Sequence, residues 1–310
     1  MGGHLHGGKT VKPQKNAAFL LAFFVFCASF HFYAEEIRYK PIGFAGMERK
    51  EVKALRTKYL TTHRKWLSET LDGGELYRIY VRAEIEKRKM PFILEYLPVI
   101  ESNYSPKARS KSGALGMWQF MLNSVKPYLV CNDYVDERLD PWKSTHAALS
   151  KLQENYDMFG DWLIAIAAYN CGAGKMRKTL KQTDRKDFWE LCDQNLLSAQ
   201  VRQYIPKLLA VADVAENAAY YGTPLPTARD AHGCTVSIPA DSFDYLSVNK
   251  AVSLCTLASE LRIDESTLTE LNLALLRGIT PPSSEYRIRL PEGLGLTAHY
   301  ALLCIDTFHR

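Results

Sequence analysis

The segment DWLIAIAAYNCGAG, which begins at Asp161, constrains the fold more than any other stretch of the chain. From Trp162 to Tyr169 it has no polar face, so a helix formed here must be surrounded by other elements. Gly172 and Gly174 are predicted to end this helix. The chain must therefore build a helical domain around it, and 310 residues that are 47% hydrophobic are enough for such a core.

Apolar residues recur at helical spacing on both sides of this segment. The predicted helices cover residues 48–71, 75–89, 91–101, 140–156 and 198–219. Gly73 and Gly74 should close the first of these helices, and Pro98 should kink the third. The pattern predicts an all-helical domain.

The composition changes at YGTPLPTARD, where Pro224 and Pro226 predict a stiff, exposed connection between two folded units. Beyond it the order is strand, helix, helix, strand, a small βααβ unit. The expected divisions are a helical segment at 35–74 that packs on the next domain, the main helical domain at 75–222, and the α+β unit at 230–310.

The N-terminal segment predicts export. Three lysines precede AAFLLAFFVFCASF, residues 17–30, an apolar run with the length of a signal-peptide core. The sites for cleavage near Ala34 and Ser29 have bulky or unsuitable residues before them, so residues 1–34 are either a signal peptide or a retained anchor. Cys27 is also a candidate site for lipidation, although Phe26 is large where a lipoprotein signal has a small residue.

Composition excludes several kinds of partner. The net charge of +5 is spread along the chain without basic clusters, so no nucleic acid is expected. The histidines and cysteines show no ligand spacing, so neither a metal nor a cofactor is expected. The six cysteines after Cys27 fit either disulfides in an oxidising compartment or buried free thiols.

Glu101 ends an apolar helical run within EYLPVIESNYSP, residues 95–106. Both apolar surroundings and a helix C-terminus favour the protonated form of a carboxyl group. Glu101 is therefore a candidate general acid, and the alternative is that its side chain reaches solvent or caps a neighbouring loop.

Four ordered motifs then show a family resemblance: ES at residue 101, GALGMWQF from Gly113, AAYNCGAGKM from Ala167 and RQYIPKLL from Arg202. Over roughly residues 75–220 the chain resembles the family 1 lytic transglycosylases, goose-lysozyme-like enzymes that cut peptidoglycan, and within them the membrane-bound lytic transglycosylase D subgroup. The resemblance implies a mainly α fold with a lysozyme-like catalytic domain. It also implies peptidoglycan glycan strands as the substrate, with other cell-wall enzymes as further partners.

The resemblance implies that Glu101 first protonates the glycosidic oxygen and then accepts the proton of the muramoyl C6 hydroxyl. The residues implied to bind the glycan are Ser102, Gly116, Met117, Trp118, Gln119, Tyr169, Asn170 and Tyr204. Core packing is the alternative for Trp118 and Tyr204, and a capping role is the alternative for Ser102. The nearest other acids, at positions 133, 136, 137 and 140, are expected to be solvated.

The C-terminal unit resembles a degenerate LysM domain, a module that holds N-acetylglucosamine polymers. The Gly-Asp-Thr turn of such domains is absent, and residues 249–253 stand in its place. A packing or spacer role is therefore as consistent with this unit as glycan binding, and it could dock on the helical domain. The sequence leaves three functions open: an exported transglycosylase, a goose-type muramidase that hydrolyses the same bond, and a non-catalytic wall-binding protein.

Overall fold

The computed structural model describes residue 1 and residues 37–184, 187–223, 225 and 243–308. The chain divides into Met1–Tyr39 and Lys40–Arg310, and the helices and strands given below lie in the second unit. Apart from Met1, the expected signal peptide or anchor at 1–34 lies outside the described residues. Within the described ranges, no helix combines the length and the apolar character that crossing a membrane requires.

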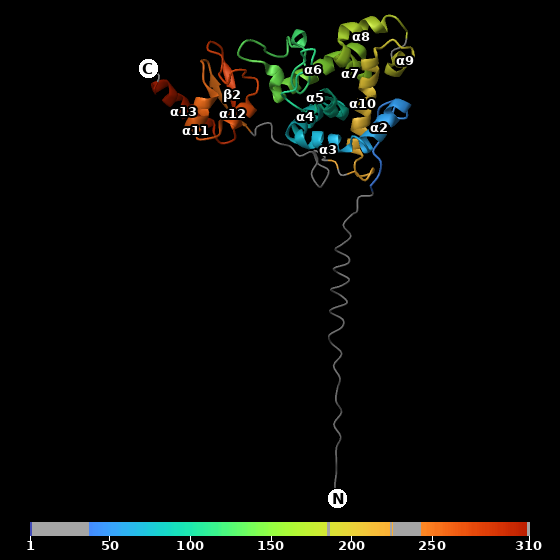
Figure 1. Ribbon diagram of the computed structural model, residues 1–310, viewed down its shortest axis with the longest axis horizontal. Helices are drawn as coiled ribbons and strands as arrows, with labels where there is room; N and C mark the ends of the chain where they lie inside the picture. Colours follow the sequence, from blue (N-terminus) through green and yellow to red (C-terminus); the bar gives the residue numbers. More distant parts are fainter. Residues whose placement is uncertain (2–36, 185–186, 224, 226–242, 309–310) are drawn as a thin grey trace. The chain divides into compact units, whose positions relative to one another are not determined.

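Helices make up most of the first 180 residues of this unit (Figure 1). In chain order they are α2 (Lys50–Leu60), α3 (Arg64–Gly73), α4 (Glu75–Lys87), the 3-10 helix η1 (Phe92–Tyr96), α5 (Leu97–Ser102), η2 (Leu122–Ser124), η3 (Glu137–Leu139), α6 (Pro141–Phe159), α7 (Trp162–Cys171), α8 (Ala173–Leu180), α9 (Phe188–Asp193) and α10 (Ala199–Glu216). The mainly α fold is confirmed.

Helix α7 is enclosed as its sequence requires. Residues 163–168 are all buried, and α6, α8 and α10 pack against the helix. Asp161 begins it by accepting a hydrogen bond from the Ile164 amide across 2.8 Å. Gly172 ends it with a left-handed φ of 88°. The expected role of Gly174 in the stop is wrong, because Gly174 already belongs to α8.

Two predicted helices are each divided in the structure. Residues 48–71 form α2 and α3, because the chain leaves the helical conformation at Thr61, whose hydroxyl donates to the Thr57 carbonyl oxygen across 2.7 Å. Residues 91–101 form η1 and then α5. Pro98 lies in the first turn of α5, where its missing N–H costs nothing, whereas a continuous α-helix would bring its ring against the carbonyl four residues earlier.

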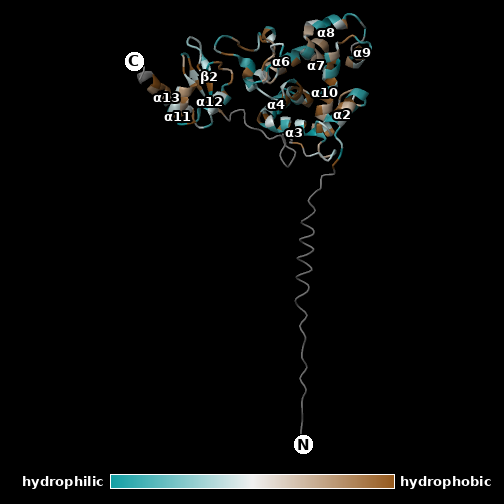
Figure 2. Ribbon diagram, in the orientation of Figure 1, coloured by the Kyte–Doolittle hydropathy of each residue, from teal (hydrophilic) through white to brown (hydrophobic). Residues whose placement is uncertain are grey.

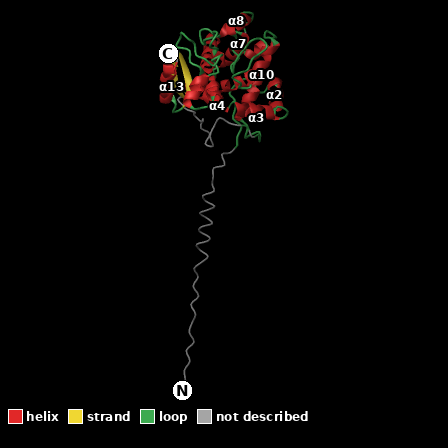
Figure 3. Cartoon of the chain, turned by 60° about the vertical axis from the view of Figure 1, so that its left-hand side comes forward, coloured by secondary structure: helices red, strands yellow, loops and turns green. Residues whose placement is uncertain are grey.

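The C-terminal part, residues 243–308, contains two antiparallel strands and three helices (Figure 3). They are β1 (Phe243–Val248), α11 (Leu254–Leu261), α12 (Glu265–Leu271), β2 (Tyr286–Pro291) and α13 (Gly295–Phe308). The register pairs Phe243 with Pro291 and Val248 with Tyr286. The βααβ order is confirmed, and the sequence prediction missed α13, whose first residue donates its amide hydrogen to Asp244 across 2.8 Å. Figure 2 shows the apolar residues, in brown, that α13 carries.

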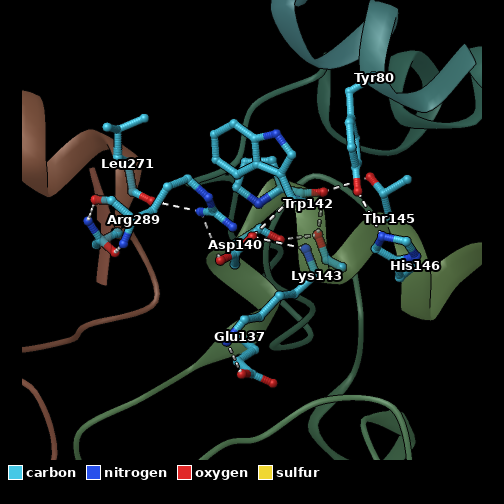
Figure 4. A network of polar contacts seen from close by, with 12 residues as sticks. Tyr80, Glu137, Asp140, Trp142, Lys143, Thr145, His146, Leu271 and Arg289 are labelled. Atoms are coloured by element: carbon cyan, nitrogen blue, oxygen red, sulfur yellow. Dashed lines mark hydrogen bonds and ion pairs between the residues drawn. The ribbon is translucent and has the colours of Figure 1, made fainter. Parts of the chain in front are cut away.

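A buried ion pair joins the C-terminal part to the helical part (Figure 4). Arg289 on β2 lies 3.2 Å from Asp140, and its guanidinium carbon is 4.1 Å from the centroid of the Trp142 ring. Asp140 also accepts hydrogen bonds from the Trp142 and Lys143 amides at the start of α6. The carboxylate therefore begins a helix and binds the C-terminal part at the same time.

The acids near residue 136 are not all solvated, so that expectation is wrong for two of them. Asp136 and Asp140 are 7% and 3% exposed. Asp136 pairs with Arg138 across 2.6 Å, and its amide donates to the Ala274 carbonyl oxygen of the C-terminal part across 2.9 Å. Both carboxylates are buried because each has an arginine partner, and such pairing cannot be read from local composition.

Candidate active site

Glu101 occupies the last turn of α5, at the wall of a cavity of about 260 Å³. The helix ends there because Asn103 and Tyr104 both adopt left-handed conformations, with φ of 56° and 59°. Two consecutive non-glycine residues in this region are uncommon and turn the chain sharply. The turn leaves Glu101 at the edge of the pocket.

A buried ionic cluster holds the residues that precede Glu101. Glu95 is 0% exposed and pairs with Arg78 across 3.0 Å and with Arg82. The Tyr104 hydroxyl donates to the Glu95 carbonyl oxygen, which closes a link from η1 across α5 to the turn beyond it. Moving these residues apart would leave a buried charge without its partner, which is costly. The cluster therefore holds in place the two segments on either side of α5.

Tyr204 on α10 donates a hydrogen bond to Glu101 Oε1 across 2.5 Å. Burial raises the pKa of Glu101 to about 7, and the Tyr204 hydrogen bond acts in the opposite direction by stabilising the carboxylate. Burial and the adjacent Glu101 carboxylate raise the pKa of Tyr204 well above its usual value, so the phenol stays a donor. Glu101 therefore has a pKa at which a carboxyl group can both give and accept a proton near neutral pH.

Hydrogen bonds fix the loop of residues 113–120, and three of the residues predicted to bind the glycan donate them. The Ser102 hydroxyl donates to the Met117 carbonyl oxygen across 2.7 Å, and the Tyr169 hydroxyl donates to that of Trp118 across 2.9 Å. The Gln119 amide donates to the Gly116 carbonyl oxygen across 2.9 Å. The first two bonds join the loop to α5 and α7, and the bond from the Gln119 side chain closes the loop on itself.

Gly116 permits the closest approach in this loop. Its φ is 83°, and a Cβ at this position would lie 1.8 Å from the carbonyl oxygen of Arg138. The Arg138 guanidinium also donates to the carbonyl oxygens of Gly113 and Phe120, at 3.3 and 3.4 Å. Since Arg138 pairs with Asp136, the loop connects through these two residues to the C-terminal part.

The side chains of Met117 and Trp118 are buried, at 1% and 0% exposure. The indole N–H of Trp118 donates to the Thr145 hydroxyl on α6 across 2.9 Å. The Trp118 ring therefore packs in the core of the helical part, and the structure does not present it for stacking on a sugar. The backbone carbonyl oxygens of both residues accept the bonds from Ser102 and Tyr169.

Four of the predicted residues line the pocket itself: Glu101, Gln119, Tyr169 and Asn170. The side-chain oxygen of Asn170 is buried and accepts no hydrogen bond from the described residues. A buried amide oxygen without a donor is costly, so it is suited to accept a bond from an N–H or O–H of a ligand.

Sequence reasoning missed several polar residues of this pocket, among them Lys151 on α6 and Gln200 on α10. Burial lowers the pKa of Lys151, and the Glu154 carboxylate partly offsets this. Lys151 lies four residues after the buried Ala147, so a lysine on the inward stripe of a helix was the available signal. Gln200 lies four residues before Tyr204 and shares its face of α10.

The described part of the chain holds no group of three or more His, Cys, Asp or Glu side chains able to bind a metal ion. Cys131, Cys171, Cys192 and Cys255 are thiols, whereas Cys234 lies outside the described residues. Burial raises the pKa of Cys131 and Cys192, so neither has the reactive character of an exposed thiolate.

Two protein families match this chain. Residues 80–192 match the transglycosylase SLT domain, and residues 242–302 match the LysM-like domain of the lytic transglycosylase MltD. The chain therefore carries an SLT domain followed by a LysM-like domain of the MltD type. Both identifications agree with the resemblance that the sequence motifs show.

Among individual relatives, membrane-bound lytic murein transglycosylase D of Escherichia coli (strain K12) is 36% identical over 186 residues, which is 58% of this chain and 40% of that protein. Peptidoglycan transglycosylase gp16 of Escherichia phage T7 is 34% identical over 116 residues, 36% of this chain and 8% of that protein. The chain thus spans less than half the length of these curated relatives. The solved structure of the 70 kDa soluble lytic transglycosylase SLT70 from Escherichia coli covers 59% of this chain and 38% of its own, with 21% identity and a TM-score of 0.36.

Proposed function

We propose that this protein is an exported peptidoglycan lytic transglycosylase that cleaves the bond between N-acetylmuramic acid and N-acetylglucosamine. The observation that carries the proposal is the environment of Glu101. Glu101 has a pKa of about 7, and no other Asp or Glu is among the described residues that line its pocket. A hydrolase that works with paired carboxylates needs a second one, whereas attack by a hydroxyl group of the substrate does not.

Glu101 acts twice in the proposed mechanism. In its protonated form it gives its proton to the glycosidic oxygen as the bond to the muramoyl anomeric carbon breaks. The resulting carboxylate then accepts the proton of the muramoyl C6 hydroxyl, whose oxygen forms the new bond to the anomeric carbon. The products are a 1,6-anhydromuramoyl end and a free N-acetylglucosamine hydroxyl, and Glu101 is protonated again.

The other site residues orient the glycan and the acid. Tyr204 positions the Glu101 carboxyl group through its hydrogen bond and stabilises the carboxylate that Glu101 becomes after it has given up its proton. Asn170 and Gln119 offer their side-chain amide oxygens to N–H or O–H groups of the sugars, since both N–H groups of the Gln119 side chain are bonded to carbonyl oxygens of Ala108 and Gly116. Ser102, Gly116, Met117, Trp118 and Tyr169 act by fixing the backbone against which the glycan lies.

We place the protein in the cell envelope or periplasm, with the N-terminal segment as a signal peptide or membrane tether. The relative from Escherichia coli is a membrane-bound protein by its name, which supports this placement. Fractionation of cells expressing the full chain, with and without residues 1–34, tests it. Recovery of both forms in the cytoplasm would contradict export.

Product analysis tests the reaction. Purified protein is incubated with sacculi, and the released muropeptides are analysed by mass spectrometry without reduction. We expect 1,6-anhydromuramoyl ends, each lighter by one water than a reducing end. Predominantly reducing muramic acid ends would assign the chain to the muramidases, and the absence of any release by folded protein would leave the wall-binding alternative.

A further inference from the structure

A second pocket, with a volume of about 430 Å³, lies beside the turn that holds Glu101. Its walls include Ile100 and Asn103, the residues that flank Glu101 and Ser102 in the chain. Three aromatic side chains also line it: Tyr59 of α2, Trp66 of α3 and His63 between the two helices. Lys207 of α10 lines it as well. No motif of the sequence analysis includes the three aromatic residues, whereas Lys207 belongs to RQYIPKLL.

Helix α10 connects this aromatic pocket with the pocket that holds Asn170. Gln200 lines the Asn170 pocket, Tyr204 bonds to Glu101, and Lys207 lines the aromatic pocket. Residues at i, i+4 and i+7 share one face of an α-helix, and seven residues span about 10 Å along its axis. One face of α10 therefore runs from the first pocket, past the acid, to the second.

The aromatic pocket has the surface that a sugar ring requires. The Trp66 and Tyr59 rings stack with centroids 5.8 Å apart and planes 25° apart, and His63 meets both rings edge-on. Tyr59 is only 6% exposed, so it supports Trp66 from the core side and leaves Trp66 partly open to solvent. A rigid indole offers apolar area at low entropic cost, and Asn103 and Lys207 beside it are exposed polar groups.

We propose that Trp66, His63 and Asn103 with Lys207 form a second glycan-binding subsite, which holds N-acetylhexosamine units on the far side of the scissile bond from Asn170. This inference rests on the proposed function, since cleavage inside a glycan strand requires sugar on both sides of Glu101. It gives α2 and α3, which precede the matched SLT residues 80–192, a direct role in substrate binding.

Binding of neutral N-acetylglucosamine oligomers to the full chain tests the subsite without turnover. The parent is the Glu101→Gln protein, and Trp66→Leu and Trp66→Phe are added to it. Trp162→Leu is the matched control, because Trp162 also stacks on a tyrosine, Tyr156, with centroids 4.4 Å apart, yet lines neither pocket.

In the parent, the dissociation constant should fall as the oligomer lengthens from two to six sugars, because only long oligomers span both pockets. Trp66→Leu should weaken binding of the long oligomer about tenfold and remove most of this length dependence, and Trp66→Phe should restore part of it. Trp162→Leu should bind like the parent. Unchanged affinity for the long oligomer in Trp66→Leu protein with a normal melting temperature would overturn the proposal.

A second variant covers the case in which Trp66→Leu does not fold. Asn103→Gly removes an exposed side chain at a left-handed position that glycine tolerates, so the fold should be kept. Combined with Lys207→Ala, this change should lower the affinity for the long oligomer severalfold. Binding like that of the parent would count against the subsite. Digestion of sacculi is measured separately. If the wild-type protein does not digest sacculi, the proposed reaction is contradicted, whereas normal digestion by the Trp66→Leu protein contradicts only the subsite.

Discussion

The Tyr204 hydroxyl reaches the Glu101 carboxyl group across 2.5 Å, although the two residues are 103 positions apart in the chain. The bond couples α10, at the end of the helical part, to the short helix α5. It stabilises the ionised form of an acid that burial drives toward the protonated form. The balance of these two effects sets the pH range in which Glu101 can donate a proton.

The rate of glycan cleavage should fall as the pH rises above about 7, since Glu101 must be protonated to begin the reaction. Tyr204→Phe removes the bond that lowers the pKa of Glu101, so this alkaline limb should shift to higher pH while the maximal rate decreases. The pH dependence of kcat/KM on soluble glycan strands measures both effects. An unshifted limb in folded Tyr204→Phe protein would show that the hydroxyl does not act on the acid.

Stability should depend on pH through the same group. Glu101 has a folded-state pKa of about 7 against 4.5 for an ordinary glutamate, so ionisation lowers the free energy of unfolding as the pH rises from 4.5 through 7. Glu101→Gln removes this penalty, which is about 3 kcal/mol when fully expressed. Denaturant unfolding should therefore show the variant more stable than the wild type at pH 8 and nearly equal at pH 4.5. Equal stability at pH 8 would argue against a desolvated carboxyl group.

Gly116→Ala should destabilise the 113–120 loop more than the same change at Gly113. Both glycines have positive φ, at 83° and 88°, but only the Cβ at residue 116 would meet a neighbour, 1.8 Å from the Arg138 carbonyl oxygen. We expect a loss of about 3 kcal/mol for Gly116→Ala and about 1 kcal/mol for Gly113→Ala. Thermal unfolding measures the difference, and equal losses would mean that the loop can move away from Arg138.

Arg289→Leu should destabilise the protein by about 3 kcal/mol, because it leaves the Asp140 carboxylate buried without its cation. Arg287 on the same strand is exposed over the Tyr245 ring, so Arg287→Leu is the matched control and should cost less than about 1 kcal/mol. Asp140→Asn combined with Arg289→Leu should recover part of the loss. Purely additive losses in this cycle would show that the pair does not hold the two parts together.

The C-terminal part should bind glycan weakly. Val252, in the segment that replaces the Gly-Asp-Thr turn, is 2% exposed, and its amide donates to the Thr280 hydroxyl across 2.8 Å. That segment therefore packs inward instead of shaping an open groove. Residues 230–310 alone should be retained poorly on sacculi, and firm retention competed by N-acetylglucosamine oligomers would overturn this expectation.

The sequence predicts those features that depend on local pattern. The enclosure of α7 and the two strands of the C-terminal part follow from periodicity and turn residues, and the family motifs identify Glu101. Long-range pairing is what escapes such reasoning. Neither the Asp140–Arg289 pair nor the contact of Gly116 with Arg138 has a local signature, because each joins residues whose proximity only the folded chain creates.

The most direct test of the proposed mechanism is release of anhydromuropeptides from sacculi by wild-type and Glu101→Gln proteins, compared by mass spectrometry at matched folded concentration. The amide cannot donate the first proton or accept the second, so we expect 1,6-anhydromuramoyl products from the wild type and none above background from the variant. Circular dichroism and the unfolding curve establish that the variant is folded. Substantial 1,6-anhydromuramoyl release by folded Glu101→Gln protein would contradict the assignment of Glu101 as the catalytic acid.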